Sequence, residues 1–273
     1  MALCAGIDGL GLGLSLVVRD YRTVCHVERE IHAVGVLASR MADKTLHEAP
    51  IFGDIATFDG SPWAGKVDVI HAGFACQPWS SGGKRRGKKD SRWLWPEIAR
   101  IVCEVRPPIV LLENVPGILD GGIQDIFGTM AQEGYDAAWG SFRATDVGAP
   151  HRRERVFMLA YSGGVGLKAI RAAHDEHRHN ELWDEFDGCG SCYDCHGCVG
   201  ETWPPGVDDI EAWTSIEEEA PEAAAWENLD DVLRGANGAT SWVDSMRACG
   251  NGVVPSMAAY AFVDLARSII EEV

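Results

Sequence analysis

The chain has 273 residues, 46% of them hydrophobic, and a formal net charge of −17. A chain of this length and composition can fill a core without disulfide bonds, and it contains no apolar run of the roughly 20 residues that cross a bilayer. Its nine cysteines are an odd number, and the crowding of four of them between Cys189 and Cys198 does not fit a secreted disulfide scaffold and favours a reducing cytosol.

Short apolar runs alternate with amphipathic stretches over the first part of the chain, which predicts an α/β domain with a doubly wound, mostly parallel sheet over residues 1–161. The predicted strands are 23–27, 67–72, 109–112 and 156–160. Ligands bind beyond the carboxyl ends of the strands in such sheets. We therefore expect one crevice to collect the glycines and acids that follow the strands, namely Gly6, Glu28, Asp54, Gly73 and Glu113.

The composition changes after Ser162 to histidine, cysteine, tryptophan and acid, with little periodicity until Trp242. This change predicts a separate module over residues 162–241. The C-terminal segment, residues 242–273, contains apolar positions at helical spacing between 255 and 270. We expect a helix there that packs back on the first domain.

The charges are unevenly distributed. Between Trp203 and Asp231 there are ten carboxylates and no lysine or arginine, whereas cations gather at 84–92 and again at 151–155. The negative net charge therefore does not exclude a nucleic-acid partner, since the two basic patches can bind phosphates.

Residues 4–13 read as a strand end that turns through glycines into a helix, which lets the backbone approach a ligand and points amide hydrogens at it. The dinucleotide fingerprint G-x-G-x-x-G fails because Leu14 stands at its last glycine, which argues against a nicotinamide-dependent oxidoreductase. Glu28 can accept hydrogen bonds from both hydroxyls of a ribose, and Asp54 can accept a hydrogen bond from an adenine amino group. Each acid alone is equally read as a solvated strand end.

The most informative stretch is Gly-Phe-Ala-Cys-Gln-Pro-Trp-Ser at residues 73–80, which follows an apolar strand. Its Cys76 is placed at the mouth of the crevice, whereas most unpaired cysteines are buried and inert. A second strand ends in Glu113 and Asn114. The thiol and the carboxylate meet if these two strands are neighbours.

In these blocks and in their order, the chain resembles the DNA (cytosine-5) methyltransferase family. The matching blocks are the glycine turn at 4–9, Glu28, Asp54, the Cys-Gln-Pro loop at 76–78, Glu-Asn-Val at 113–115, His-Arg-Arg-Glu-Arg at 151–155 and Gly-Asn-Gly-Val at 250–253. They span nearly the whole chain apart from 163 to about 241, so a chance match explains them poorly. The resemblance implies a Rossmann-like, S-adenosylmethionine-dependent fold with a small irregular target-recognition module.

The resemblance also implies a chemistry. Carbon 5 of cytosine is a poor nucleophile until a thiolate adds at carbon 6, and Cys76 is expected to make that attack. A free thiol has a pKa of about 8.5, so Arg153 or Arg155 is expected to favour the thiolate. Glu113 would hydrogen-bond or protonate ring nitrogen 3, with Asn114 holding the geometry. No base for the carbon-5 proton is evident.

By the same resemblance, S-adenosyl-L-methionine is the cofactor, held at its ribose by Glu28, at its adenine by Asp54 and Ile55, and at its methionine end by Gly6, Gly9, Asn251 and Val253. The partner is double-stranded DNA with the target cytosine flipped out of the helix. The basic loop would lie on phosphates through Ser80, Lys84, Arg85, Arg86, Lys88, Lys89 and Arg92, although a solvated surface loop is the alternative.

Four positions depart from the family's usual residues. Cys4 replaces phenylalanine, Asp8 replaces glycine, Ala75 replaces proline, and His151 replaces glutamine. Loss of the proline frees the backbone beside the nucleophile. Asp8 is expected to place a carboxylate near the cofactor.

The cysteines at 189–198 have the spacing of metal ligands, and we predict zinc bound by Cys189, Cys192, Cys195 and Cys198. An iron–sulfur cluster and reduced, unliganded thiols are the alternatives.

Two further functions compete with the DNA enzyme: a transfer-RNA cytosine-5 methyltransferase, and a catalytically inactive DNA-binding homologue. The separate module favours DNA, since the family reads bases in the major groove with that region. Retention of Cys76, Glu113, Arg153 and Arg155 argues against an inactive protein. We expect a monomer without a membrane partner in the cytoplasm of a bacterial cell or a phage-infected host, and a cognate restriction endonuclease is a candidate partner.

Overall fold

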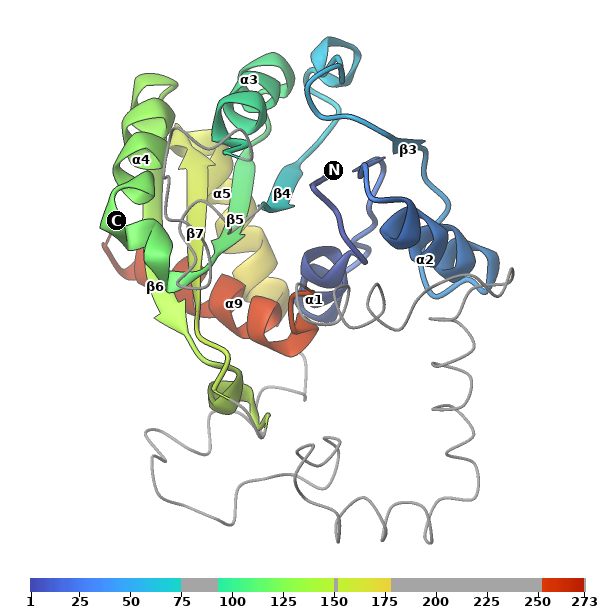
Figure 1. The fold of residues 1–273 in the computed structure, drawn as a ribbon. Coiled ribbons are helices and arrows are strands. Elements are labelled where there is room, and N and C mark those ends of the chain that lie inside the picture. The colour runs from blue at the N-terminus through green and yellow to red at the C-terminus, as the bar shows by residue number, and fades with distance from the viewer. Residues whose placement is uncertain (75–92, 150–151, 178–251, 273) are drawn as a thin grey trace, which may run out of the picture.

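Seven strands form one sheet in the computed structural model, which describes residues 1–74, 93–149, 152–177 and 252–272 (Figure 1). The sheet order is β3-β2-β1-β4-β5-β7-β6. The strands are β1 Ala2–Leu3, β2 His26–Val27, β3 Ile51–Phe52, β4 Val69–Gly73, β5 Ile109–Asn114, β6 Tyr135–Phe142 and β7 Arg155–Ser162.

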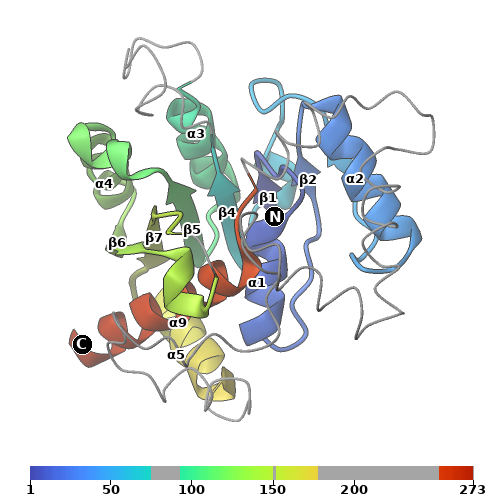
Figure 2. The ribbon, with the colours of Figure 1, turned by 60° about the horizontal axis from the view of Figure 1, so that its bottom comes forward.

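Helices cover both faces of the sheet, with α3 and α4 on one face and α1, α5 and α9 on the other (Figure 2). The α-helices are α1 Gly9–Val17, α2 Ile31–Ala42, α3 Trp95–Val105, α4 Gly122–Gln132, α5 Gly163–His177 and α9 Pro255–Glu272. Three short 3-10 helices are η1 Ser61–Trp63, η3 Pro116–Asp120 and η4 Ala144–Val147. Each face of the sheet has its own apolar cluster. None of the helices in the described ranges is long and apolar enough to span a membrane.

The predicted α/β fold with a mostly parallel sheet is confirmed. Strands β3, β2, β1, β4 and β5 pair in parallel, but β7 is antiparallel to β5 and to β6. The predicted strand at 156–160 therefore exists but runs against its neighbours. Among the described residues between β6 and β7, the longest helix is η4, which is too short for the crossover over the sheet that parallel pairing would require.

The first domain includes α5, although the sequence places residues 163–177 in a separate module. The helix packs against β7 and α9, and its Ile170 is fully buried. Its residues are more polar on average than those of α9, so the composition alone did not indicate a core helix. The rest of the predicted recognition module, residues 178–241, lies outside the described ranges.

The predicted C-terminal helix is confirmed as α9, which packs along α1 and the β6–β7 side of the sheet. Its approach to α1 is close because Gly13 has no side chain. A Cβ there would lie 2.6 Å from the carbonyl oxygen of Pro255 and 2.7 Å from the Cβ of Ala258. The end of the chain thereby forms part of the core that supports the N-terminal glycine turn.

We predict that Leu14→Ala in α1 lowers the free energy of unfolding by about 2–5 kcal/mol, because Leu14 is fully buried against α9 and its loss leaves a cavity. The matched control is Leu16→Ala in the same helix, which truncates a side chain that is 43% exposed and is expected to cost less than about 1 kcal/mol. Urea unfolding followed by circular dichroism measures both. Equal losses would contradict this packing.

Candidate functional site: a cavity at the strand ends

A cavity of about 840 Å³ lies at the carboxyl ends of the parallel strands, a size typical of small-molecule sites. All five strand-end residues expected in one crevice line it, which confirms that expectation: Gly6, Glu28, Asp54, Gly73 and Glu113. They meet because their strands are neighbours. Leu3 pairs with Val27 on one side and Ala72 on the other, and Gly73 pairs with Glu113.

Glu28 is fixed in this cavity by the backbone of two turns. Its Oε2 accepts a hydrogen bond from the Gly6 amide at 2.7 Å, and its Oε1 accepts one from the Glu30 amide at 2.8 Å. Gly6 has φ +54°, a conformation that favours glycine. A carboxylate offers about four acceptor sites, so Glu28 can hold the turn and still accept from ligand hydroxyls.

The glycine turn is joined to the far end of the chain. A Cβ on Gly9 would collide with the carbonyl oxygen of Val253, so only glycine allows the two segments to touch. Gly9, Gly252 and Val253 all line the cavity. The structure thus brings together two of the segments expected at the methionine end of a cofactor, while Asn251 lies outside the described residues.

Asp54 and Ile55 line the opposite part of the cavity, and α3 holds their loop in place. Arg100 of α3 donates to the Ile55 carbonyl at 2.8 Å and to the Phe58 carbonyl at 2.9 Å, and it also pairs with Glu104 at 2.8 Å. The sequence did not single out Arg100.

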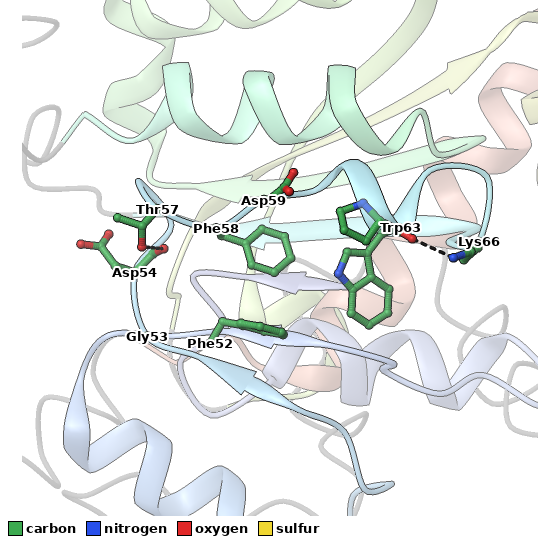
Figure 3. A pocket seen from close by; sticks show the side chains of 9 residues that line it. Phe52, Gly53, Asp54, Thr57, Phe58, Asp59, Trp63 and Lys66 are labelled. Carbon is green, nitrogen blue, oxygen red and sulfur yellow. Dashed lines mark hydrogen bonds between the residues drawn. The ribbon is translucent and has the colours of Figure 1, made fainter.

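A second cavity of about 640 Å³ begins at Asp54, which borders both. Figure 3 shows the rings of Phe52, Phe58 and Trp63 around it, with Asp54 near one end and Lys66 near the other. The rings of Phe52 and Phe58 meet edge to face with centroids 5.0 Å apart, and Phe52 is 40% exposed. The wall beyond Asp54 is therefore aromatic, a feature that the sequence pattern did not indicate.

Glu113, the residue before the last of β5, is a buried carboxylate beside a cation. Its Oε1 lies 2.9 Å from Nε of Arg155, the first residue of β7. The antiparallel register, which pairs Asn114 with Val156, sets these two strand ends side by side. Burial raises the pKa of Glu113 to about 6, even though Arg155 and Arg153 act to lower it. The carboxyl group can therefore take up or release a proton near neutral pH.

Arg153 contacts the C-terminal segment. Its guanidinium Nη2 donates a hydrogen bond to the carbonyl oxygen of Gly252. The charge of Arg153 also acts on Glu113. The two arginines predicted as catalytic residues are thus both associated with Glu113, one by direct contact and one through its field.

Asn114 holds the backbone that leads into the predicted nucleophile loop. Its Nδ2 donates to the Phe74 carbonyl at 3.2 Å, and its Oδ1 accepts from the Val115 amide at 3.0 Å. The ring of Phe74 contacts the ring of Trp93 at 5.8 Å between centroids. Phe74 and Trp93 flank residues 75–92, so contacts of the described residues hold the two ends of that loop together.

Several predicted site residues lie outside the described ranges. They are Cys76, His151, Asn251, the phosphate-binding residues from Ser80 to Arg92, and the cysteines from Cys189 to Cys198. Among the described residues, no group of three or more potential metal ligands occurs. Zinc binding by the cysteine cluster thus stays a prediction of the sequence.

None of the described cysteines is suited to be a nucleophile. Burial raises the pKa of Cys4 and of Cys25 to about 12 in each case, and burial also raises the pKa of Cys103. All three are free thiols, and their protonated form is favoured. Cys4 lines the cavity, but only as a small apolar side chain.

Asp8, whose carboxylate is expected near the cofactor, lies directly behind the wall of the cavity and does not line it. Ile7 and Gly9 line the cavity and Asp8 does not, because its side chain turns inward beneath the glycine turn. There it caps α1 by accepting from the Gly11 amide at 3.2 Å, and it contacts His26 of β2. The adjacent sequence carries little signal of this, apart from a histidine that interrupts an apolar strand.

Comparison with known proteins agrees with this arrangement. A model of the family described as C-5 cytosine-specific DNA methylase matches residues 1–203. The type II methyltransferase M.NgoMIV of Neisseria gonorrhoeae is 34% identical over 164 residues, which cover 59% of this chain and 50% of that protein. M.PspPI of Psychrobacter is 28% identical over 243 residues, 83% of this chain and 54% of that protein. The chain spans about half the length of the curated relatives it matches.

Among solved structures, the S. pombe Dnmt2 methyltransferase has the same fold, with a TM-score of 0.59, 15% identity and 98% of both chains covered.

We predict that Glu113 makes the chain less stable as the pH rises. Its folded pKa of about 6 lies above its usual value of 4.5, so the folded protein holds the proton more tightly than the unfolded chain. Stability is therefore lost between about pH 4.5 and 6.5, by about 2 kcal/mol.

Denaturant unfolding across this pH range gives the free energy of unfolding of wild type and of Glu113→Gln. The difference between the two values isolates the contribution of Glu113, since the other groups titrate in both proteins. Glu48→Gln, which changes an exposed carboxylate, serves as the control. A constant difference between wild type and Glu113→Gln at all these pH values would refute the prediction.

Proposed function

The chain belongs to the C-5 cytosine-specific DNA methylase family, and from that premise we propose that it transfers a methyl group from S-adenosyl-L-methionine to carbon 5 of cytosine in double-stranded DNA. One observation carries the proposal. A single cavity joins Glu28 and Asp54 to the ion-paired Glu113 and to Phe74, two residues before Cys76.

The residues of the cavity fit the cofactor by their chemistry. Glu28 is a fixed acceptor for ribose hydroxyls, Asp54 and Ile55 offer a carboxylate and an apolar surface for adenine, and the turn from Gly6 to Gly9 faces the cavity with its backbone. Val253, and Asn251 by family resemblance, complete the methionine end. When bound, S-adenosyl-L-methionine supplies an electrophilic methyl group on a cationic sulfonium.

The protein's first task is to make carbon 5 nucleophilic. The Cys76 thiolate forms a bond to carbon 6 of a flipped-out cytosine, and the ring's electron pair moves toward nitrogen 3. Glu113 places a proton at nitrogen 3, which its pKa of about 6 allows near neutrality. Arg155 holds the carboxylate at 2.9 Å and so fixes where that proton is delivered.

The adduct must then collapse. Once carbon 5 carries the methyl group, a base removes its remaining proton, the ring double bond re-forms, and the Cys76 sulfur leaves carbon 6 with its electron pair. Nitrogen 3 returns its proton to Glu113, which restores the acid for the next turnover. Asn114 supports both steps through the Phe74 carbonyl, since that contact positions the backbone entering the loop of Cys76. We assign no side chain to the base.

DNA is proposed as the substrate for two reasons. The relatives are type II methyltransferases, enzymes of restriction-modification systems, and a cognate restriction endonuclease is the corresponding candidate partner. The basic run from Ser80 to Arg92 follows the nucleophile and would contact phosphates. Base readout is assigned to residues 178–241, where zinc bound by Cys189, Cys192, Cys195 and Cys198 would organise the module.

We predict that Cys76→Ser reduces methyl transfer by at least about a thousandfold while leaving cofactor affinity within about threefold of wild type, because the alcohol cannot form the adduct and no cofactor contact is assigned to residue 76. Transfer of labelled methyl groups to DNA, to transfer RNA or to neither measures activity and separates the three candidate functions.

The same experiment includes a trapping test. DNA with 5-fluorocytosine at the target lacks the proton that must leave, so wild-type protein should remain covalently attached through Cys76. Peptide mapping of the trapped complex identifies the residue. Attachment elsewhere, or substantial transfer by Cys76→Ser, would remove Cys76 from its assigned role.

We predict that Glu28→Gln weakens S-adenosyl-L-methionine binding by about ten- to a hundredfold, since one of the amides of Gly6 and Glu30 loses its acceptor and the ribose loses a carboxylate. Isothermal titration calorimetry measures the dissociation constant. Glu48→Gln is the matched control at an exposed glutamate and should bind as wild type does. Unchanged affinity of Glu28→Gln would place the ribose elsewhere.

A further inference from the structure

A buried polar cluster lies directly beneath the glycine turn and centres on Asp8. The Asp8 carboxylate accepts from the Gly11 amide at 3.2 Å, from the Thr23 hydroxyl at 3.0 Å and from Nε2 of His26 at 3.0 Å. Nε2 of His71 lies 3.8 Å from its other side. All of these side chains are buried, with the Asp8 residue only 1% exposed.

The cluster touches the cofactor cavity through one side chain. His71 of β4 lines the cavity and contacts Asp8 behind it. Ile7 and Gly9, on either side of Asp8 in the chain, line the cavity as well. The carboxylate is therefore separated from the cavity by a single imidazole, at the segment assigned to the methionine end of the cofactor.

The cluster retains a negative charge at neutral pH. Burial by itself would raise the pKa of Asp8, but the hydrogen bond from His26 and the other contacts hold it below its usual value. Burial lowers the pKa of His71 to about 3, so that imidazole is neutral. Nε2 of His26 lies 3.0 Å from the carboxylate and supplies one of the contacts that stabilise the charge.

Neither the turn nor the helix cap requires this charge. Asp8 has φ 61°, and glycine or asparagine adopts that left-handed conformation at least as readily. Asparagine also caps helices as well as aspartate does. The side chain, charged or not, requires glycine at position 11, because a Cβ there would collide with its carboxylate group. A buried charge that the local structure does not need calls for another role.

Resting on the proposed function, we propose that Asp8 is a specificity-determining residue of the cofactor site, whose buried negative charge favours the cationic sulfonium donor over the neutral thioether product, S-adenosyl-L-homocysteine. A charge inside the protein is screened far less than one in water and acts over several ångströms. Donor and product have nearly the same shape, so charge is the main property by which the site can tell them apart. The consequence is weaker product inhibition.

The test compares the dissociation constants of donor and product by isothermal titration calorimetry. Wild type is set against Asp8→Asn, which keeps the size and the cap but removes the charge, and against Asp8→Gly, the family's usual residue. The control is Asp43→Asn, at an exposed carboxylate beyond the far end of α2. Thermal unfolding confirms that each variant is folded.

We expect the preference for donor over product to fall by about three- to tenfold in both Asp8 variants. The loss should come from weaker donor binding, with product affinity changed by less than about twofold. Asp43→Asn should keep the wild-type preference. Asp8→Gly keeps the test decisive if Asp8→Asn does not fold, because glycine enters the left-handed turn without strain.

An unchanged preference, or an equal loss of both affinities, overturns the inference and leaves the proposed function intact, since it shows that Asp8 only shapes the turn. A wild-type protein that binds neither ligand overturns the proposed function and this inference together.

Discussion

The buried pairing of Glu113 with Arg155 is the interaction on which the site depends. A carboxylate this deep is costly unless a cation lies beside it, and Arg155 is beside it only because β7 runs antiparallel to β5. If β7 were parallel to β5, its first residue, Arg155, would lie at the amino ends of the parallel strands, away from Glu113. The reversal of this single strand therefore decides where the arginines meet the crevice built by the parallel strands.

The same crevice needs segments from both ends of the chain. Gly9 touches Val253 and Gly13 touches Pro255, so the segment before α9 forms a wall of the site while α9 itself packs in the core. Glycine is required at both contacts for the plain reason that a Cβ has no room. Core packing and the shape of the cavity are thus coupled in α1, where Gly9 lines the cavity and Gly13 contacts the start of α9.

Beneath this wall, Asp8 shows how a departure from a family's usual residue can be accommodated. Aspartate tolerates the left-handed conformation, Gly11 leaves space for the carboxylate, and His26 and Thr23 satisfy it. The carboxylate is therefore buried under the turn instead of being exposed in the cavity. Its remaining influence on the cavity is electrostatic, through the neutral ring of His71.

The sequence by itself determined the alternating α/β pattern, the C-terminal helix and the convergence of Gly6, Glu28, Asp54, Gly73 and Glu113, because strand ends and helical spacing are local properties of the chain. Only the tertiary structure decided the direction of β7, the inclusion of α5 in the first domain, the support of the Ile55 loop by Arg100 and the inward turn of Asp8. Each of these depends on contacts between residues distant in sequence, and no local pattern of side chains records which distant group will satisfy a buried charge or cover an apolar face.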